Sequence, residues 1–311
     1  MSADRAAVTL LAVAPEFQLR VRREEPMSKH TSWRVGGPAD LFFTPRDRED
    51  LAAFLRVLPA QTPVTWVGLG SNLLVRDGGI RGAVICTRGA LTRLERRAQH
   101  TVYCESGVPC ARLTRSCGKW GLGQAEFFAG IPGTLGGALA MNAGAYGGET
   151  WRYVRKVEVI TRAGTIRTRE ASDYQVSYRH VGAPANDEWF LAAELEFAAG
   201  DSEGAAAAAG AVRALALRRR QTQPLGAWSC GSVFTNPPGD HAARLIEAAG
   251  LKGCRVGGAV VSEKHANFIL NEGGANGSDL ETLIAQVQDT VQRVHGVRLV
   301  PEVRMVGESV R

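Results

Sequence analysis

The stretch FFAGIPGTLGG at residues 127–137, followed closely by NAGAYGG at residues 142–148, decides what kind of fold this chain adopts. Half of the residues from Gly130 to Gly137 are glycine, and Pro132 restricts the bend, so the backbone is left bare for a ligand to approach. The alternative is a crossing point where two chain segments pack closely. A cofactor with a diphosphate and a large ring needs this much open backbone, and we therefore favour a binding function.

A third glycine-rich loop, GLGSN at residues 68–72, follows the short apolar stretch 64–67, which predicts a strand. Glycines there let backbone N–H groups reach pyrophosphate oxygens, and Ser71 and Asn72 add donors. The loop lacks the third glycine of the G-x-G-x-x-G motif, so taken alone it fits a plain tight turn better. Three such loops in one half of the chain favour a cofactor site over packing alone.

Bulk composition narrows the class of protein. A length of 311 residues predicts two domains, or one domain with a clear subdomain division. The formal charge of +6 is compatible with nucleic acid. Scattered basic residues without stacked aromatic motifs favour an anionic small molecule instead, so we expect no nucleic-acid partner. No apolar run approaches the roughly 18–20 residues of a membrane helix, and we expect no membrane partner.

The cysteines and the N-terminal head indicate a cytoplasmic protein. The six cysteines form no C-x-x-C pair and no Cys/His metal spacing, so we expect buried free thiols in a reducing compartment and no metal site. The apolar head at residues 6–14 follows Asp4 and Arg5 and precedes Pro15. We interpret it as a short helix or an extension, not as a signal peptide.

Hydrophobic periodicity predicts two α+β lobes and a third segment. In the first lobe we expect a strand or extended lead-in at 17–23, a buried strand at 41–43, a helix at 48–58 and strands at 64–67 and 83–87. In the second we expect a strand at 101–106, a helix at 110–119, antiparallel strands at 154–160, 165–169 and 191–197, and a long helix at 205–220. In the third we expect a strand containing Ser232, helices at 242–249 and 279–295, and strands at 259–262, 268–270 and near 297–304.

Four polar features are candidates for chemistry. Ser232, in GSVFTNP at residues 231–237, is either a buried hydroxyl placed for chemistry or a strand-end serine that caps its neighbours. Arg179 is either a solvated surface residue or a guanidinium fork for a carboxylate. Glu302 is either an edge-strand glutamate or an acid inside a site, and SEKHAN at residues 262–267 fits a ligand-facing loop and a solvated turn about equally.

Seven segments, in one order along nearly the whole chain, carry a resemblance to a known family. They are HTSWRVGG at 30–37, GLGSNLL at 68–74, the glycine-rich run 130–148, YR at 178–179, GSVFTNP at 231–237, SEKHAN at 262–267 and PEV at 301–303. Together they resemble the UDP-N-acetylenolpyruvoylglucosamine reductases (UDP-N-acetylmuramate dehydrogenases), flavoenzymes of bacterial peptidoglycan precursor synthesis.

The resemblance implies an α+β fold that is divided into an N-terminal extension and two domains. An N-terminal extension at 1–16 precedes an FAD-binding domain of the PCMH (vanillyl-alcohol-oxidase-like) type at 17–217. That domain consists of two α+β lobes, at about 17–97 and 98–217. A smaller C-terminal α/β substrate-binding domain follows at 218–311. The short stretch between Arg179 and Ser232 resembles the type II form of the family, which lacks an inserted loop bearing a substrate-facing tyrosine.

The resemblance also implies roles for individual residues. Ser232 becomes the proton donor, and Arg179 and Glu302 become the pair that binds and polarises the substrate carboxylate. The implied contacts of non-covalent FAD are Gly68, Leu69, Gly70, Ser71, Asn72, Leu73, Gly130, Ile131, Pro132, Gly133, Thr134, Gly137, Asn142, Gly144 and Ala145. Weaker candidates for substrate binding are Tyr178, Arg218, Arg219, Asn236, Lys264, His265 and Asn267.

The implied reaction reduces the enolpyruvyl ether of UDP-N-acetylglucosamine to UDP-N-acetylmuramate, with NADPH as reductant, hydride from FAD N5 and a proton from Ser232. Two alternatives remain open on the sequence. Another flavin oxidase of the same FAD-binding superfamily needs a base where Ser232 stands. A non-catalytic nucleotide-sugar binding protein keeps the glycine loops and binds no flavin.

Overall fold

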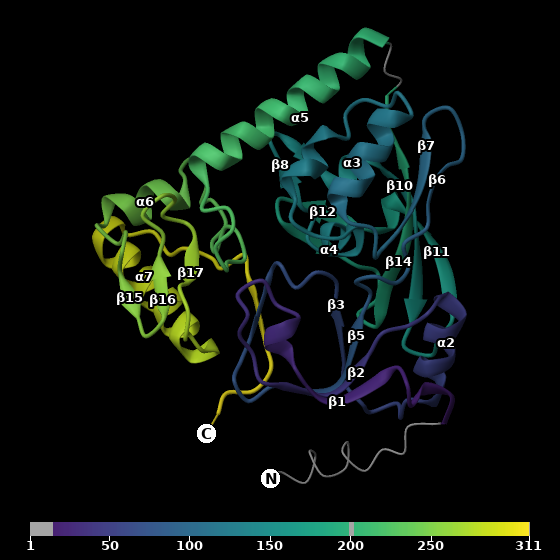
Figure 1. Ribbon diagram of the computed structural model, residues 1–311, viewed down its shortest axis with the longest axis horizontal. Coiled ribbons are helices and arrows are strands. Elements are labelled where there is room, and N and C mark those ends of the chain that lie inside the picture. The colour runs from purple at the N-terminus through teal and green to yellow at the C-terminus, as the bar shows by residue number, and fades with distance from the viewer. Residues whose placement is uncertain (1–14, 199–201, 311) are drawn as a thin grey trace.

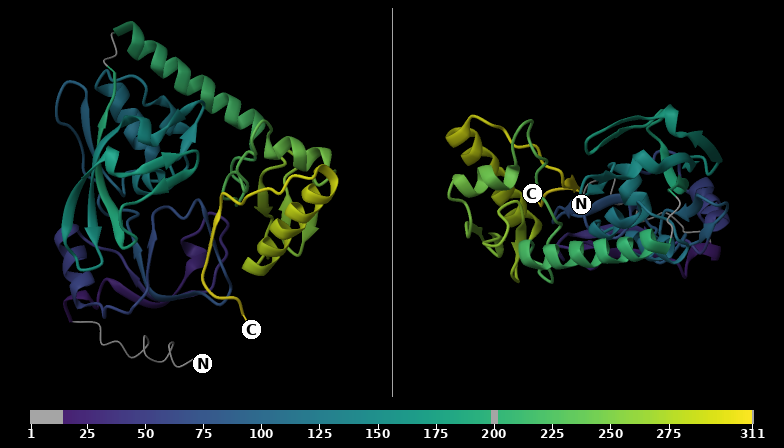
Figure 2. Two further views of the ribbon diagram at one scale, coloured as in Figure 1. Left: turned by 180° about the vertical axis from the view of Figure 1, so that it is seen from behind. Right: turned by 90° about the horizontal axis from the view of Figure 1, so that it is seen from above.

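The computed structural model describes residues 15–198 and 202–310, and its elements form two lobes and a smaller third unit (Figure 1). Residues 1–14 of the expected N-terminal extension lie outside the described residues. Helix α5 (Ser202–Thr222) runs from the second lobe to the third unit, and both views of Figure 2 show it as a long strap joining the two.

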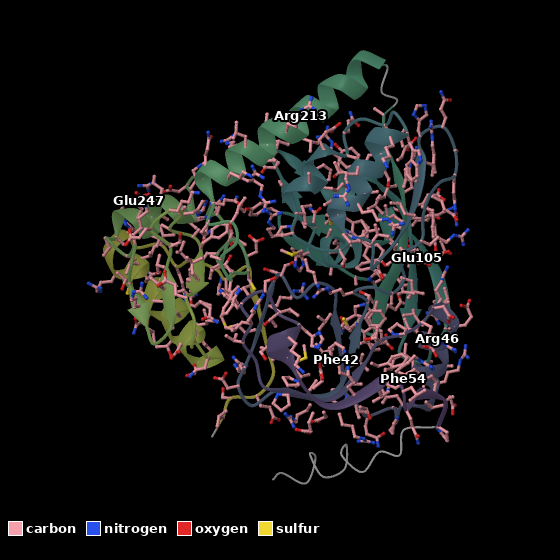
Figure 3. The ribbon with its side chains drawn as sticks, viewed as in Figure 1. Phe42, Arg46, Phe54, Glu105, Arg213 and Glu247 are labelled. Carbon is pink, nitrogen blue, oxygen red and sulfur yellow. The ribbon has the colours of Figure 1, made fainter. Side chains whose placement is uncertain are left out.

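The first lobe is a four-stranded sheet with one helix packed on it. The strands, in spatial order, are β1 (Val21–Pro26), β2 (Pro38–Phe43), β5 (Ile80–Cys86) and β3 (Val64–Val67). Helix α2 (Arg48–Val57) begins where the Asp47 carboxylate accepts a hydrogen bond from the Asp50 N–H at 2.8 Å. Its Phe54 (Figure 3) stacks on Phe43 with ring centroids 4.0 Å apart, which fixes the helix against β2. Two short 3-10 turns, η1 (Pro15–Phe17) and η2 (Met27–Lys29), flank β1.

The second lobe is a five-stranded antiparallel sheet. Its strands, in spatial order, are β11 (Ile166–Glu170), β10 (Val154–Thr161), β14 (Glu188–Glu196), β7 (Thr101–Glu105) and β6 (Leu94–Arg96). Helices α3 (Cys110–Lys119) and α4 (Leu135–Ala140) bury Leu113 and Leu139 in one core with Val157 of the sheet. The remaining elements are η3 (Glu126–Gly130), β8 (Gly144–Ala145), β9 (Gly148–Glu149), η4 (Thr150–Tyr153), η5 (Ala171–Asp173), β12 (Gln175–Ser177) and β13 (His180–Gly182). They carry two of the three glycine loops and Arg179.

The third unit packs two helices, α6 (Ala242–Ala248) and α7 (Gly277–His295), against a small antiparallel sheet. That sheet consists of β15 (Arg255–Val256), β16 (Ala259–Val261) and β17 (Ile269–Asn271). Helix α7 begins with a capping box between Asn276 and Asp279 and ends at Gly296, whose φ of +70° is the left-handed conformation that glycine tolerates best.

The third unit is fixed to the first lobe at several points. Its core includes Trp33 from the first lobe, whose indole N–H donates to the Ile269 carbonyl at 2.7 Å. The Asp77 carboxylate accepts hydrogen bonds from the first two N–H groups of α7, those of Gly277 and Ser278, at 2.7 and 2.9 Å. The final strand β18 (Arg304–Val306) pairs in parallel with β4 (Leu73–Val75) of the first lobe. These contacts hold the third unit beside the loop at residues 68–72.

Three expectations about elements differ from the structure. Ser232 does not lie on a strand, because its segment has a single bridge, between Phe234 and Pro301, in place of a continuous ladder. The last strand covers only 304–306 instead of 297–304, because the main chain before Arg304 hydrogen-bonds the Ser232 segment. The lead-in at 17–23 contains a turn, and β1 begins only at Val21.

Candidate active site

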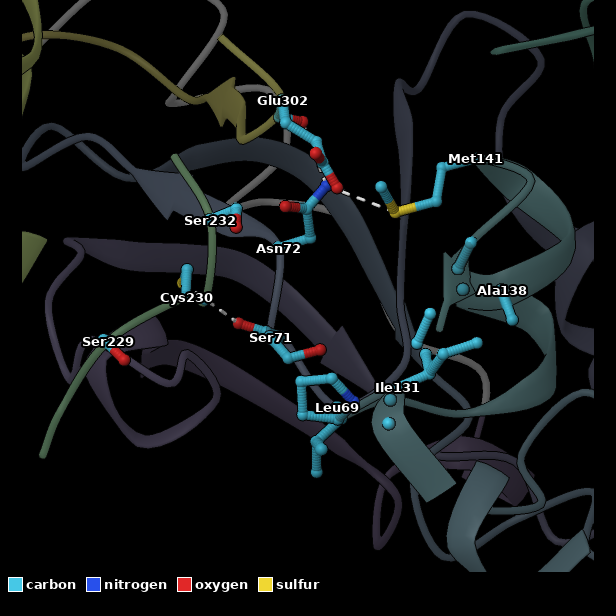
Figure 4. A pocket seen from close by; sticks show the side chains of 18 of the residues that line it. Leu69, Ser71, Asn72, Ile131, Ala138, Met141, Ser229, Cys230, Ser232 and Glu302 are labelled. Atoms are coloured by element: carbon cyan, nitrogen blue, oxygen red, sulfur yellow. Dashed lines mark hydrogen bonds between the residues drawn. The ribbon is translucent and has the colours of Figure 1, made fainter. Parts of the chain in front are cut away.

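The three glycine-rich loops converge on one cavity of about 490 Å³, lined also by residues of the third unit. Every predicted cofactor contact except Asn142 lines it, namely Gly68, Leu69, Gly70, Ser71, Asn72, Leu73, Gly130, Ile131, Pro132, Gly133, Thr134, Gly137, Gly144 and Ala145. Figure 4 shows Ser229, Cys230 and Ser232 along one wall, with Ala138, Met141 and Ile131 across from them. The loops therefore form a single site although they lie on two lobes.

The glycines of these loops serve two different purposes. A Cβ on Gly70 would lie 1.9 Å from the His30 carbonyl oxygen, so this glycine is required by close packing. A Cβ on Gly137 would meet nothing within 4 Å, so Gly137 presents open backbone to the cavity. Beside Gly68, the buried Thr134 hydroxyl has no hydrogen-bond partner within the protein. Bare backbone and an unpartnered hydroxyl at one cavity fit a phosphate-bearing cofactor such as FAD.

Asn142, predicted as a cofactor contact, lies outside the cavity lining. Its side chain is only 1% exposed, and its amide N–H groups donate to the Glu149 carboxylate at 3.0 Å and to the Ser177 carbonyl at 3.1 Å. Its amide oxygen accepts from the Trp151 N–H at 3.1 Å. The protein itself therefore satisfies this side chain.

Arg179 and Glu302 meet at the cavity, although 123 positions separate them in sequence (302 − 179). Arg179 lies in the turn between β12 and β13, and its Nε lies 3.1 Å from Glu302 Oε1. Its Nη2 donates to the Gly144 carbonyl at 2.9 Å. Both side chains are mostly buried, with 19% and 12% exposed. The structure therefore brings together the two residues that the resemblance predicts as a carboxylate-binding pair.

The environment of Glu302 favours its neutral form. Burial raises the pKa of the Glu302 carboxyl above its usual value, and the neighbouring Arg179 guanidinium offsets part of that rise. Asn72 donates to the Glu302 main-chain carbonyl at 3.1 Å, which connects this acid to the loop at residues 68–72. A carboxyl with a raised pKa beside a cation is able to share a proton with a ligand.

Ser232 is half-buried and faces the same cavity from the third unit (Figure 4). The segments of Ser232 and Glu302 are joined directly, because the Glu302 N–H donates to the Val233 carbonyl at 2.8 Å. On its other side the Ser232 segment is held by Asn267, whose main-chain carbonyl accepts from the Val233 N–H at 2.9 Å. Ser232 thus lines the same cavity as the Arg179–Glu302 pair, on a segment fixed at both sides.

The predicted substrate residues are mostly not brought to this cavity. Arg219 lines it, with its guanidinium donating to the Ala129 carbonyl at 3.3 Å. Tyr178 lines a second cavity of about 380 Å³, which shares the Arg179–Glu302 pair with the first. The others line neither cavity in the part of the chain that the structure describes, namely Arg218, Asn236, Lys264, His265 and Asn267.

These remaining candidates have contacts within the protein. The Asn236 amide oxygen accepts from the Ala242 N–H at the start of α6, and the Lys264 ammonium donates to the Arg220 carbonyl. The His265 ring packs edge-to-face on Phe268. The Asn267 side-chain amide bonds both main-chain groups of Phe234, which favours a structural role, and the expected ligand role stays a prediction.

Several lining residues were not predicted. They are Trp66, Ala138, Ala140, Met141, Ala143, Tyr146, Gln223, Pro224, Leu225, Gly226, Ala227, Ser229, Cys230, Gly231, Phe268 and Arg304. Arg304 had a usable signal, because a side chain two positions after Glu302 in extended chain points to the same side. Met141 had none, since it reaches the site only through the end of helix α4.

The described residues contain no cluster of three or more metal-ligating side chains, and no described helix is long and apolar enough to cross a membrane. All six cysteines are free thiols, and all except Cys254 are buried. Burial raises the pKa of the Cys110 and Cys230 thiols to about 12, so these are packing residues and not nucleophiles.

Comparison with known proteins agrees with this geometry. Residues 39–169 match the model of an FAD binding domain, which together with the glycine-lined cavity defines a flavin-dependent oxidoreductase fold. Residues 223–306 match the C-terminal domain of UDP-N-acetylenolpyruvoylglucosamine reductase. The chain belongs to the UDP-N-acetylenolpyruvoylglucosamine reductase family. The expected two-lobed FAD-binding part with a C-terminal substrate domain is thereby confirmed, whereas the boundary between them at 217/218 stays a prediction.

Individual relatives support the assignment over nearly the full length. The chain is 59% identical over 289 residues to the UDP-N-acetylenolpyruvoylglucosamine reductase of Alkalilimnicola ehrlichii, covering 93% of this chain and 95% of that protein. It is 58% identical to the Methylococcus capsulatus reductase, with 92% of each chain covered. The crystal structure of the Thermus caldophilus reductase superposes with a TM-score of 0.78 at 31% identity, covering 92% of this chain and 98% of that one.

Proposed function

We propose that Ser232, Arg179 and Glu302 are the catalytic groups with which this chain carries out the reaction of its family. The protein is an FAD-dependent oxidoreductase that uses NADPH to reduce the enolpyruvyl ether of UDP-N-acetylglucosamine to UDP-N-acetylmuramate, a step in peptidoglycan precursor synthesis. The observation that carries the residue assignment is the close contact of the Arg179 guanidinium with the mostly buried Glu302 carboxyl, at the same cavity that Ser232 lines.

The glycine loops hold the cofactor in this proposal. Open backbone at Gly137 and the free Thr134 hydroxyl accommodate the diphosphate, and Ser71 and Asn72 lie on the opposite loop. FAD, when bound, supplies the hydride that the reduction requires. The chain's own residues supply the remaining parts of the reaction.

Arg179 and Glu302 bind and polarise the substrate carboxylate. As hydride adds to the terminal methylene carbon, negative charge develops on the adjacent carbon and its carboxylate. The Arg179 guanidinium stabilises that charge, and the Glu302 carboxyl does so as a hydrogen-bond donor, because burial raises its pKa and thereby favours its protonated form. The guanidinium is already in place before the substrate reacts, since the Gly144 carbonyl and Glu302 hold it.

Ser232 then donates its hydroxyl proton to the adjacent carbon. A serine hydroxyl is a weak acid, so its position must compensate for its pKa. The hydrogen bonds from Val233 to Asn267 and from Glu302 to Val233 provide that positioning, because they fix the main chain next to Ser232. Arg219 and Tyr178, which face the two cavities, are the remaining candidates for contacts to the diphosphate part of the substrate.

Steady-state NADPH oxidation by purified holoenzyme tests the proposal. Rapid oxidation that requires UDP-N-acetylglucosamine enolpyruvate is expected. Oxidation that proceeds equally with oxygen alone would support a flavin oxidase instead. A colourless protein that binds the nucleotide sugar without NADPH oxidation would support a binding protein.

We further propose a cytoplasmic location, supported by six free cysteines, and expect neither nucleic acid nor membrane as partner.

A further inference from the structure

Asn142 occupies an unusual place for a residue of the glycine-rich run. It is 1% exposed, lies outside the cavity lining, and has a φ of +46°. Asparagine tolerates this left-handed conformation better than most non-glycine residues, but glycine tolerates it better still. The backbone conformation alone therefore does not explain why this position holds asparagine. The side chain must contribute something that glycine lacks.

Its contacts lead to the turn that carries Arg179. The Asn142 amide donates to the carbonyl of Ser177, the last residue of β12, at 3.1 Å. The main-chain carbonyl of Asn142 accepts from Arg179 Nη1 at 3.4 Å. Arg179 itself has a φ of +56°, which is unfavourable for an arginine, so its turn depends on support from outside. Asn142 contacts this turn at the Ser177 carbonyl through its side chain and at the Arg179 guanidinium through its main chain.

The other side of Asn142 is attached to the core of the second lobe. Its amide also donates to Glu149 at 3.0 Å, and its amide oxygen accepts from the main-chain N–H of the buried Trp151. The Trp151 indole in turn donates to the Leu139 carbonyl at 2.8 Å. This chain of hydrogen bonds joins the exposed β12–β13 hairpin to the buried core of the second lobe.

We propose that Asn142 is a positioning residue for the substrate step: it holds the Arg179 turn against the lobe core and thereby sets where the guanidinium meets Glu302 and the substrate carboxylate. The inference rests on the proposed function, because it assumes that Arg179 binds that carboxylate. It assigns Asn142 no contact with substrate or cofactor. NADPH has no equivalent carboxylate, so reduction of the flavin by NADPH does not depend on this positioning.

The decisive variant is the double substitution Asn142→Asp with Glu149→Gln. The introduced aspartate tolerates the left-handed backbone and still accepts from the Trp151 N–H, while the introduced glutamine donates the hydrogen bond that Glu149 accepts in the wild type. Only the bond to the Ser177 carbonyl is left without a donor. The matched control is Glu149→Gln alone, in which Asn142 keeps all of its bonds. Asn142→Gly, which keeps the backbone and deletes the whole side chain, is a second test.

Holoenzyme of each variant is examined for FAD content, thermal midpoint, substrate affinity from the flavin absorbance change, and the two half-reactions separately. In the double variant we expect normal FAD content, flavin reduction by NADPH within about threefold of wild type, and oxidation of the reduced flavin by substrate about 10- to 100-fold slower. Glu149→Gln is expected to match wild type, and Asn142→Gly to share the slow substrate step.

Two results would overturn the inference. Substrate oxidation within about threefold of wild type in the double variant would show that the Ser177 bond does not matter. Loss of FAD or of cooperative unfolding in the double variant would assign Asn142 a purely structural role. Failure of the wild-type reduced enzyme to react with the substrate would instead refute the proposed function itself.

Discussion

Replacing Asn267 with alanine separates a structural role for this residue from the substrate-binding role that its sequence context suggested. Asn267 is 4% exposed. Its amide oxygen accepts from the Phe234 N–H at 3.0 Å, and its amide nitrogen donates to the Phe234 carbonyl at 2.8 Å. The alanine variant therefore leaves both main-chain groups of a residue that is 1% exposed without these partners.

The expected loss of stability follows from those two bonds. A buried main-chain group that loses its partner costs about 1–3 kcal/mol, and two such groups share one residue here. We therefore expect Asn267→Ala to lower the free energy of unfolding by about 2–4 kcal/mol. Because Phe234 lies two positions after Ser232, the substrate half-reaction is expected to slow as well, while flavin reduction by NADPH changes less.

Urea unfolding of the apoprotein and the holoenzyme, together with steady-state kinetics, measures these effects. Lys264→Ala is the matched control, because Lys264 came from the same predicted loop but is exposed, and a change within about 0.5 kcal/mol is expected there. An Asn267→Ala variant that unfolds like wild type and shows only a raised KM for the nucleotide-sugar substrate would refute the structural reasoning. It would restore Asn267 as a ligand.

Four further substitutions test the site. Ser232→Ala is expected to leave flavin reduction by NADPH nearly intact and to slow the substrate half-reaction by about 10²- to 10⁴-fold; normal turnover would remove Ser232 as proton donor. If neutral Glu302 is the active form, kcat/KM for the substrate falls as pH rises through the raised pKa of Glu302. Glu302→Gln is then expected to lower kcat by roughly 10²-fold and to abolish this fall in kcat/KM at high pH. An unchanged pH profile in the variant would assign the fall to another group. Gly137→Ala is expected to keep the fold, with a gain of up to about 1 kcal/mol in helix preference, but to bind FAD more weakly. Gly70→Ala, at a φ of +71° and against the His30 carbonyl, is expected to lose more than about 2 kcal/mol of stability. Equal FAD content in wild type and in the Gly137→Ala variant would contradict the division between glycines that present open backbone and glycines required by close packing.

Local patterns were sufficient where a segment forms its own structure. The helix at 48–58 was predicted from its apolar spacing behind acidic residues, and α2 covers Arg48–Val57 with Asp47 as its cap. The helix predicted at 110–119 and the strand predicted at 64–67 have the bounds of α3 and β3. In each case the periodicity, the cap or the following glycine lies within the segment itself, so no distant partner had to be known.

Prediction failed where the partner of a segment is distant in sequence. The segment around Ser232 reads as a strand, yet its main chain bonds a side chain, Asn267, and the stretch before Arg304. Similarly, Glu302 stands at the site because its main-chain groups contact Val233 and Asn72. Neither partner is visible in local hydrophobic spacing. The resemblance to the family predicted that these residues share one site, whereas the local sequence pattern around each residue did not.

The asparagines show why ligand residues are hard to recognise from sequence alone. A primary amide offers a donor and an acceptor, as the main chain does, so it can replace a missing strand or helix partner in an irregular loop. Asn267 and Asn271 do this, bonding Phe234 and Trp33 from buried positions, whereas Asn72 bonds the Glu302 carbonyl while lining the cavity. All three lie within a few residues of a glycine or a phenylalanine in the sequence. Only burial distinguishes them, and burial depends on the whole fold. For an asparagine in a loop beside an active site, the first interpretation is therefore that its amide replaces a main-chain hydrogen-bond partner. It is interpreted as a ligand residue only where its amide faces the cavity.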